Sequence, residues 1–312
     1  MKFICLTCLI ALLAVSVIAQ ERNQSVPFVA YWQKGDSYDF RVTKIRKLVT
    51  DGMETQKDSS SSIINFSVLK EEKDRYEIGW GFKFSPEQMQ IIKTLPKKVQ
   101  KLYHEKIIYI TNEVGIFLEV MNIESLQESV NATIPFIVNM KSKDAEQLEK
   151  NKKIVAPFIE MARSKEWIEQ TIMKEIQLFH FVYGYEFEVG EEISYEDSLY
   201  HLSNNFPVRA HSKISFTDYN IIESIATIKH ETVLNPEDAT EMYSQSKTKK
   251  GKSNDILSES TNSIFKISEQ SVFIYNLTTS IPKQIEYKKT SVLEEELKTN
   301  SMIYIIRIEL IE

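Results

Sequence analysis

Few residues of this 312-residue chain have the types and spacing that catalysis or metal binding requires. Two of its five histidines, His104 and His230, are each followed by a glutamate, as in the first half of a zinc-protease motif. The second metal ligand should stand four residues after the histidine, but Ile108 and Leu234 occupy those positions. The sequence therefore predicts no metal centre, and we expect no cofactor.

An acidic group offers the clearest carboxylates for hydrolysis. It comprises Glu191, Glu192, Glu196 and Asp197. Two carboxylates at a suitable separation cleave glycosidic bonds, but charged residues beside turns usually face solvent, and we expect a solvated hairpin here. The eight glycines form none of the loops typical of nucleotide-binding proteins or serine hydrolases. The sequence therefore favours a non-catalytic protein over an enzyme.

Aromatic residues alternate densely along two predicted strands. The first run places Tyr76, Trp80, Phe82 and Phe84 on one face, and the second run does the same with Phe181, Tyr183, Tyr185 and Phe187. If the sheet curves, these faces line a cup for a lipid or another apolar ligand. The simpler alternative is an ordinary core, since burying each ring stabilises the fold by roughly 2–3 kcal/mol.

Strands and one helical region must position these side chains. Asp51-Gly52 predicts a hairpin turn, and Ser85 and Asn235, each followed by Pro-Glu, predict helix starts. Residues 122–180 are rich in Glu, Lys, Gln and Ile and predict two or three helices, after which strands resume. We expect an α+β fold, a large curved antiparallel sheet with a helical insertion packed on it.

Matches at one constant offset predict that the sheet consists of two similar halves. The offset is 150 residues and relates Ile64, Phe66, Ile78 and Ser85-Pro86-Glu87 to Ile214, Phe216, Ile228 and Asn235-Pro236-Glu237. The alternative is that any two strand-turn-helix units share such residues. The predicted organisation is a signal peptide, an N-terminal β-rich half, a helical insertion and a C-terminal β-rich half. Their bounds are 1–19, 20–121, 122–180 and 181–312.

The N-terminus predicts export. Lys2 precedes an apolar run from Phe3 to Ile18, and Ala19 ends a small-residue cleavage site. The run is shorter than the roughly 20 residues that span a bilayer, so we expect cleavage rather than anchoring. Cleavage removes both cysteines, Cys5 and Cys8, and leaves no disulfide and no transmembrane segment. The net charge of −6 argues against nucleic acid as a partner.

Three stretches resemble exported proteins of Bacteroidetes-type bacteria. They are "YWQKGDSYDFRVTKIRK", "NEVGIFLEVMN" and the Val-Ile-Ala-Gln cleavage site. The resemblance implies the periplasm or outer surface of a Gram-negative cell. The expected layout is also similar to the half-barrel of periplasmic lipoprotein carriers of the LolA type, by analogy of architecture alone.

The leading expectation is a non-catalytic envelope protein that binds a lipid, another apolar ligand or an envelope protein partner. One alternative is a structural scaffold without a ligand. The other is a hydrolase acting on an envelope polymer, with Glu192, Glu196 and Asp197 as the carboxylates to test.

Overall fold

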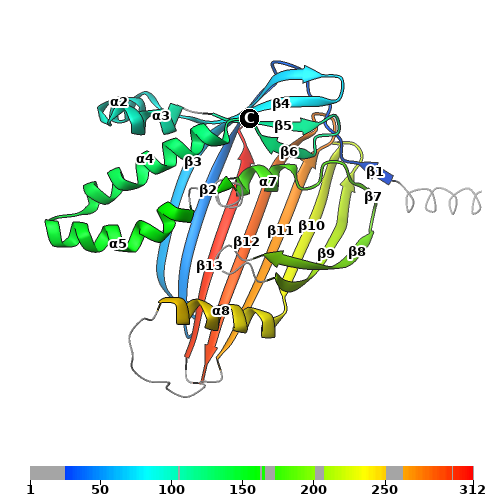
Figure 1. Ribbon diagram of the computed structural model, residues 1–312. Coiled ribbons are helices and arrows are strands. Elements are labelled where there is room, and N and C mark those ends of the chain that lie inside the picture. Colours follow the sequence, from blue (N-terminus) through cyan, green and yellow to red (C-terminus); the bar gives the residue numbers. More distant parts are fainter. Residues whose placement is uncertain are drawn as a thin grey trace, which may run out of the picture. The chain divides into compact units, whose positions relative to one another are not determined.

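A computed structural model gives the architecture (Figure 1). It describes residues 25–104, 106–161, 164–165, 173–200, 207–250, 263–296 and 298–311. Six helices lie in these ranges: α2 (Pro86–Thr94), α3 (Lys97–His104), α4 (Ile123–Lys141), α5 (Ala145–Met161), α7 (Lys174–His180) and α8 (Pro236–Lys250). The predicted α+β class is confirmed, with strands predominating.

Eleven strands form one open sheet. They are β2 (Ser37–Thr50), β3 (Met53–Glu72), β4 (Arg75–Lys83), β5 (Ile107–Asn112), β6 (Phe117–Val120), β8 (Glu192–Tyr200), β9 (Pro207–Asn220), β10 (Ile225–Leu234), β11 (Ile264–Asn276), β12 (Ile281–Glu295) and β13 (Lys298–Leu310). The hydrogen-bonded order is β6-β5-β4-β3-β2-β13-β12-β11-β10-β9-β8. The pairings from β3 to β6 and from β8 to β12 are antiparallel. Two short strands, β1 (Ser25–Pro27) and β7 (Glu186–Glu188), pair separately.

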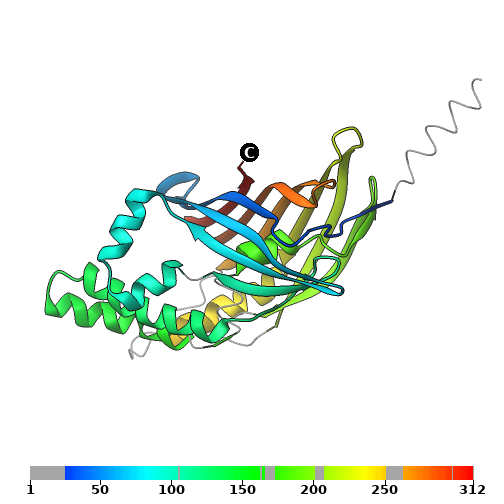
Figure 2. The same cartoon turned by 90° about the horizontal axis from the view of Figure 1, so that it is seen from above.

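The chain divides into two compact units, each discontinuous in sequence. Unit 1 comprises Met1–Val29, Leu48–Gln56 and Gly184–Ile303, and unit 2 comprises Ala30–Lys47, Lys57–Tyr183 and Tyr304–Glu312. The helices of region 122–180 belong to unit 2. In both Figure 1 and Figure 2, α3, α4 and α5 lie side by side, and α3 also contacts β4.

Local sequence signals fix the turns and helix starts. Asp51 (φ 50°) and Gly52 (φ 80°) both adopt the left-handed conformation of a two-residue hairpin, as predicted. Ser85 caps α2 in a reciprocal box, in which its Oγ accepts from the Gln88 N–H while Gln88 Oε1 accepts from the Ser85 N–H. Asn235 Oδ1 caps α8 by accepting from the backbone N–H groups of Glu237 and Asp238 in its first turn.

The sheet of unit 1 buries one face of β9, β10 and β11. Helix α8 packs on this face through Ala239 and Met242, which join Val208, Ala210, Leu234 and Ile267 in one apolar cluster. We call this face the covered face. Further along the same strands, Phe28 packs edge-on against Phe216 and Tyr275, with ring centroids 5.9 and 5.8 Å apart. The covered face is therefore apolar at both ends.

Unit 2 has its own core, built from aromatic rings. Trp32 packs against Phe66 at 5.1 Å and against Tyr183 at 5.2 Å, and Phe179 of α7 packs against Phe40 at 5.5 Å. An ion pair between Lys44 on β2 and the buried Glu175 on α7 adds to these contacts. Helix α7 thus closes the aromatic side of β2 and β3.

The helical region was predicted well, but its end was not. Helices α4, α5 and α7 confirm that region 122–180 is helical, while residues 162–163 and 166–172 lie outside the described residues. The strand predicted from Phe181 onward is wrong for residues 181–184, which form a turn. Gly184 has a φ of 83°, its N–H donates to Phe28 O, and the chain becomes strand only at β7.

Two further predictions concern the chain ends and membrane segments. The predicted signal peptide, residues 1–19, and its two cysteines lie outside the described residues. Among the helices that the structure describes, none combines the length and the apolar character needed to cross a bilayer.

Candidate ligand-binding site

The structure distributes the eight aromatic candidates over different surroundings. Tyr76, Trp80, Tyr183 and Phe187 are buried, and Phe84 and Phe181 are half-buried. Phe82 and Tyr185 each expose 51% of their surface. Tyr76, Trp80, Phe82, Phe84, Phe181 and Tyr183 belong to unit 2, whereas Tyr185 and Phe187 belong to unit 1.

In unit 2 the buried candidates belong to a packed core. Trp80 is 5% exposed and meets the ring of Phe179 at 5.5 Å, and Tyr76 meets Trp32 at 5.3 Å. Edge-to-face packing of buried rings is typical of a hydrophobic core. Phe82 and Phe84 line a recess, a pocket of about 170 Å³ beside the start of α2.

A buried histidine completes this core. His180 Nδ1 lies 2.8 Å from the carbonyl oxygen of Gly115, and its Nε2 lies 2.8 Å from the hydroxyl of Tyr109. A carbonyl only accepts, so Nδ1 carries the proton and Nε2 accepts from Tyr109. Burial lowers the pKa of His180 to about 4, and the hydrogen bond to Gly115 opposes this shift. His180 is thus a neutral residue with both nitrogens satisfied, as is typical of a structural role.

The candidate hydrolytic carboxylates are not brought together. Glu192 pairs with Lys213 at 2.6 Å and Glu196 with His211 at 2.9 Å, both on the exposed surface of β8 and β9. Asp197 follows Glu196 directly in the strand, and successive side chains point to opposite faces. This arrangement matches the expected solvated surface rather than a pair of catalytic carboxylates.

The sequence reading missed a row of polar residues that crosses the covered face of unit 1. Five residues stand opposite one another on consecutive strands from β8 to β12: Tyr195, Ser212, Thr232, Glu269 and Lys289. We call these five residues the polar row. Neighbouring strands lie about 4.8 Å apart, so the row extends over roughly 19 Å. It lies between the apolar cluster under α8 and the ring packing of Phe28 against Phe216 and Tyr275.

Hydrogen bonds connect the first half of the polar row. Ser212 Oγ and Thr232 Oγ1 are 2.9 Å apart, and both residues are buried. The Tyr195 hydroxyl lies 3.2 Å from Nε2 of His230, which belongs to the next row of the same face, and the same Nε2 lies 3.4 Å from Thr232 Oγ1. Burial, with a smaller contribution from Asp197, raises the pKa of the Tyr195 phenol. These groups form one connected network of hydroxyls around an imidazole.

The second half of the polar row carries charge. Lys289 Nζ lies 3.0 Å from the Glu269 carboxylate, and the two side chains expose 39% and 18% of their surface. Tyr195 and His230 are also half-buried. The row is therefore accessible in part, whereas the rings of Phe216 and Tyr275 further along the strands are not, at 0% and 1% exposed.

A sequence signal for the polar row existed. On the covered face of β9, β10 and β11, the alternate residues are apolar except near the middle, where the pattern is interrupted by Ser212, His230, Thr232, Glu269 and Ser271. Each interruption alone is unremarkable, and the strand register is needed to align them. Within the described ranges, no three His, Cys, Asp or Glu side chains are grouped so as to hold a metal ion.

Comparison with known proteins does not assign the chain to a family. No protein-family model matches the chain, and no curated protein is significantly similar to it.

Proposed function

We propose that this protein binds an amphiphilic molecule without chemically changing it. The polar group of the ligand contacts the accessible part of the polar row of unit 1, and its apolar part lies against the exposed Ile193 on the neighbouring edge of the same face. The observation that carries the proposal is the polar row itself, which five neighbouring strands build across a face that is apolar at both ends.

Energetics favour a functional reason for the row. A buried hydroxyl contributes little net stability even when it is hydrogen-bonded, and an apolar residue would serve a pure core better. Ser212 and Thr232 are only 1% and 4% exposed. Two residues along the same strands, on the same face, stand the apolar Ala210 and Leu234, which belong to the cluster under α8. Retaining polar residues at the middle of three strands is consistent with selection for contact with a polar group.

The chemistry of the row indicates the kind of polar group. Tyr195, His230 and Lys289 all offer hydrogen-bond donors and are all partly accessible. Lys289 is already paired with Glu269, so the local charge is balanced at neutral pH. A carboxylic acid, an ester or an amide next to an acyl chain would match these donors, and the exposed Ile193 on β8 is a neighbouring apolar contact.

Export to the envelope of a Gram-negative bacterium is part of this proposal. It is supported by the signal-like residues 1–19 and by the resemblance of the N-terminal third to exported proteins. An amphiphile carrier is useful in such a compartment, because acyl chains do not cross an aqueous space unaided.

We further propose that the chain arose by duplication. In its favour, β2-β3-β4, a helical segment and β5-β6 follow the same order as β8-β9-β10, α8 and β11-β12. The matched pairs are also buried alike, with Phe66 and Phe216 both at 0% and Ile78 and Ile228 both at 0% exposed. The strand register differs, since Ile78 pairs with Val68 whereas Ile228 pairs with Phe216.

Titration with a fluorescent fatty acid tests the proposed function. Tyr195→Phe and Thr232→Val each remove a hydroxyl from the polar row while keeping the side-chain shape. We expect about tenfold weaker binding for each, the value of one hydrogen bond of about 1.4 kcal/mol. Glu231→Gln and His211→Gln are matched controls on the opposite face of the same strands and should bind as the wild type does.

Equal affinity for all four variants would overturn the assignment of the row. Thermal unfolding of each variant, measured in parallel, separates a lost contact from a lost fold. Absence of binding by the wild type to a panel of fatty acids, lysophospholipids and acylated peptides would refute the proposed function altogether.

A further inference from the structure

A second surface, in unit 2, has a charge opposite to that of the protein as a whole. Residues 86–106 contain five lysines and two glutamates, a net charge of +3 in a chain whose net charge is −6. These residues include all of α2 and α3, which lie next to each other. The excess of positive charge is thus local and sits on two short helices.

Helix α3 has a buried apolar side and an exposed basic side. Val99 is buried at 3% exposure, whereas Lys97, Lys98 and Lys101 are exposed. Lys101 Nζ lies 3.6 Å from Glu128 on α4, a pair whose side chains are 51% and 78% exposed and therefore weak. Within the part of the chain that the structure describes, Lys97 and Lys98 have no ion-pair partner. We call Lys97, Lys98 and Lys101 the basic face.

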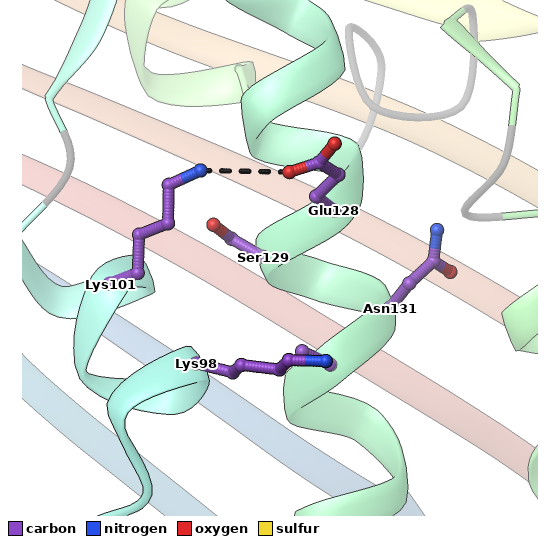
Figure 3. Close-up of a pocket in the computed structure, with 6 residues that line it drawn as sticks. Lys98, Lys101, Glu128, Ser129 and Asn131 are labelled. Atoms are coloured by element: carbon purple, nitrogen blue, oxygen red, sulfur yellow. Dashed lines mark ion pairs between the residues drawn. The ribbon is translucent and has the colours of Figure 1, made fainter.

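A pocket opens beneath the basic face. It has a volume of about 460 Å³ and lies between α3 and α4, lined by Lys98, Lys101, Glu128, Ser129, Asn131 and Ala132. Figure 3 shows Lys98 and Lys101 reaching from α3 across to α4, with Ser129 between them. The volume suffices for a phosphate ester with a small alcohol attached.

Exposed apolar surface accompanies the charge. Ile91 on α2 exposes 65% of its surface, although its neighbour Ile92 is buried. Basic helices that also expose large apolar side chains are typical of proteins that lie on a membrane surface. Lysines near an anionic leaflet gain attraction without needing the fixed geometry that a protein partner demands.

We propose that the basic face docks the protein onto an anionic lipid surface, with lipid phosphates next to Lys98 and Lys101 at the mouth of the pocket. The argument for a membrane rather than an acidic protein is the exposed Ile91 on the adjoining helix, because a basic surface that also exposes a large apolar side chain suits a lipid surface. The proposal does not rest on the polar row, since vesicle binding can occur with or without an amphiphile in unit 1.

Vesicle sedimentation with the full chain tests the proposal. The probes are vesicles of pure phosphatidylcholine and vesicles in which about a third of the lipid is phosphatidylglycerol. The wild type should bind the anionic vesicles and lose most of that binding in 0.5 M salt, where charges are screened beyond a few ångströms. Replacing Lys97, Lys98 and Lys101 together by glutamine should weaken partitioning about 100-fold, as each lysine near such a surface contributes about 1 kcal/mol.

A charge-matched control isolates the location of the lysines. Lys34, Lys57 and Lys73 are also exposed and belong to the same unit, and their triple glutamine variant has the same net charge as the test variant. This control should bind within about twofold of the wild type. All proteins carry the same N-terminus, so any apolar contribution of residues 1–19 cancels in the comparison.

Three results would overturn the proposal. The first is equal binding of the wild type to neutral and anionic vesicles. The second is the same loss in both triple variants, which would mean that overall charge alone decides. The third is displacement from vesicles by millimolar glycerol phosphate, which would assign the pocket to a free phosphate ester. If the triple variant fails to fold, Lys98→Gln and Lys101→Gln are tested singly, each with an expected loss of about fivefold.

Discussion

The buried His180 makes a sharp prediction about acid stability. Its pKa in the folded protein is lowered to about 4, and in the unfolded chain it returns to 6.5. Between these values the unfolded state binds a proton that the folded state does not, so folding stability falls as pH decreases through this window. We expect His180→Gln to lack this contribution, because glutamine can keep both hydrogen bonds but does not titrate here.

The size of this loss of stability follows from the pH interval between the pKa values of His180 in the folded and unfolded states. One proton changes the free energy of unfolding by about 1.4 kcal/mol for each pH unit, and the window covers about 2.5 units. The stability of the wild type relative to His180→Gln should therefore fall by roughly 3 kcal/mol between pH 7 and pH 4. Taking the difference between the two proteins cancels the carboxylates, which titrate in both.

Urea unfolding at half-unit intervals of pH measures this difference directly. The wild-type curve should be steeper than that of His180→Gln below pH 6.5, and the two should run parallel above pH 7. Parallel curves over the whole range would refute the reasoning, since they would mean that His180 keeps an ordinary pKa and is open to water. A difference that grows in the opposite direction would mean that His180 is charged in the folded protein.

Two further predictions concern the stability contributed by a helix cap and by two glycines with positive φ. Asn235→Ala should lower the free energy of unfolding by about 1 kcal/mol through loss of the α8 cap, measurable by urea unfolding, while no change would show that the cap is not needed. Gly115→Ala should cost more than Gly35→Ala: both have positive φ, but a Cβ at Gly115 would lie 2.9 Å from the ring of Tyr183 whereas nothing lies within 4 Å at Gly35. We expect losses of about 3 and about 1 kcal/mol, and equal losses would contradict the crowding argument.

Elements with a local cause could be predicted from the sequence. The Asp51-Gly52 turn needs two left-handed residues in succession, and the starts of α2 and α8 need the side-chain oxygens of Ser85 and Asn235. Each of these signals lies within four residues of its effect. The same holds for the alternation of Tyr76, Ile78 and Trp80 on β4, all of which are buried as their pattern indicates.

Features with a distant cause could not be predicted. Alternating aromatic residues at 181–187 also suit a helix end followed by a turn, and the backbone bonds between Phe28 and residues 184–185 decide in favour of the turn. The polar row depends on the register of five strands, and an extra residue on β9 opposite the step from Thr227 to Ile228 shifts the pairing of β9 with β10. Sequence periodicity places Ser212 and Thr232 on a face but does not place them opposite each other.

Native mass spectrometry of the protein, purified from a bacterial periplasm without detergent, tests the central claim most directly. An amphiphile on the polar row predicts an added mass of several hundred daltons that disappears on denaturation and is reduced in a Tyr195→Phe/Thr232→Val variant. The same bare mass in native and denatured spectra of the wild type, in preparations that retain cellular lipid, would contradict the claim.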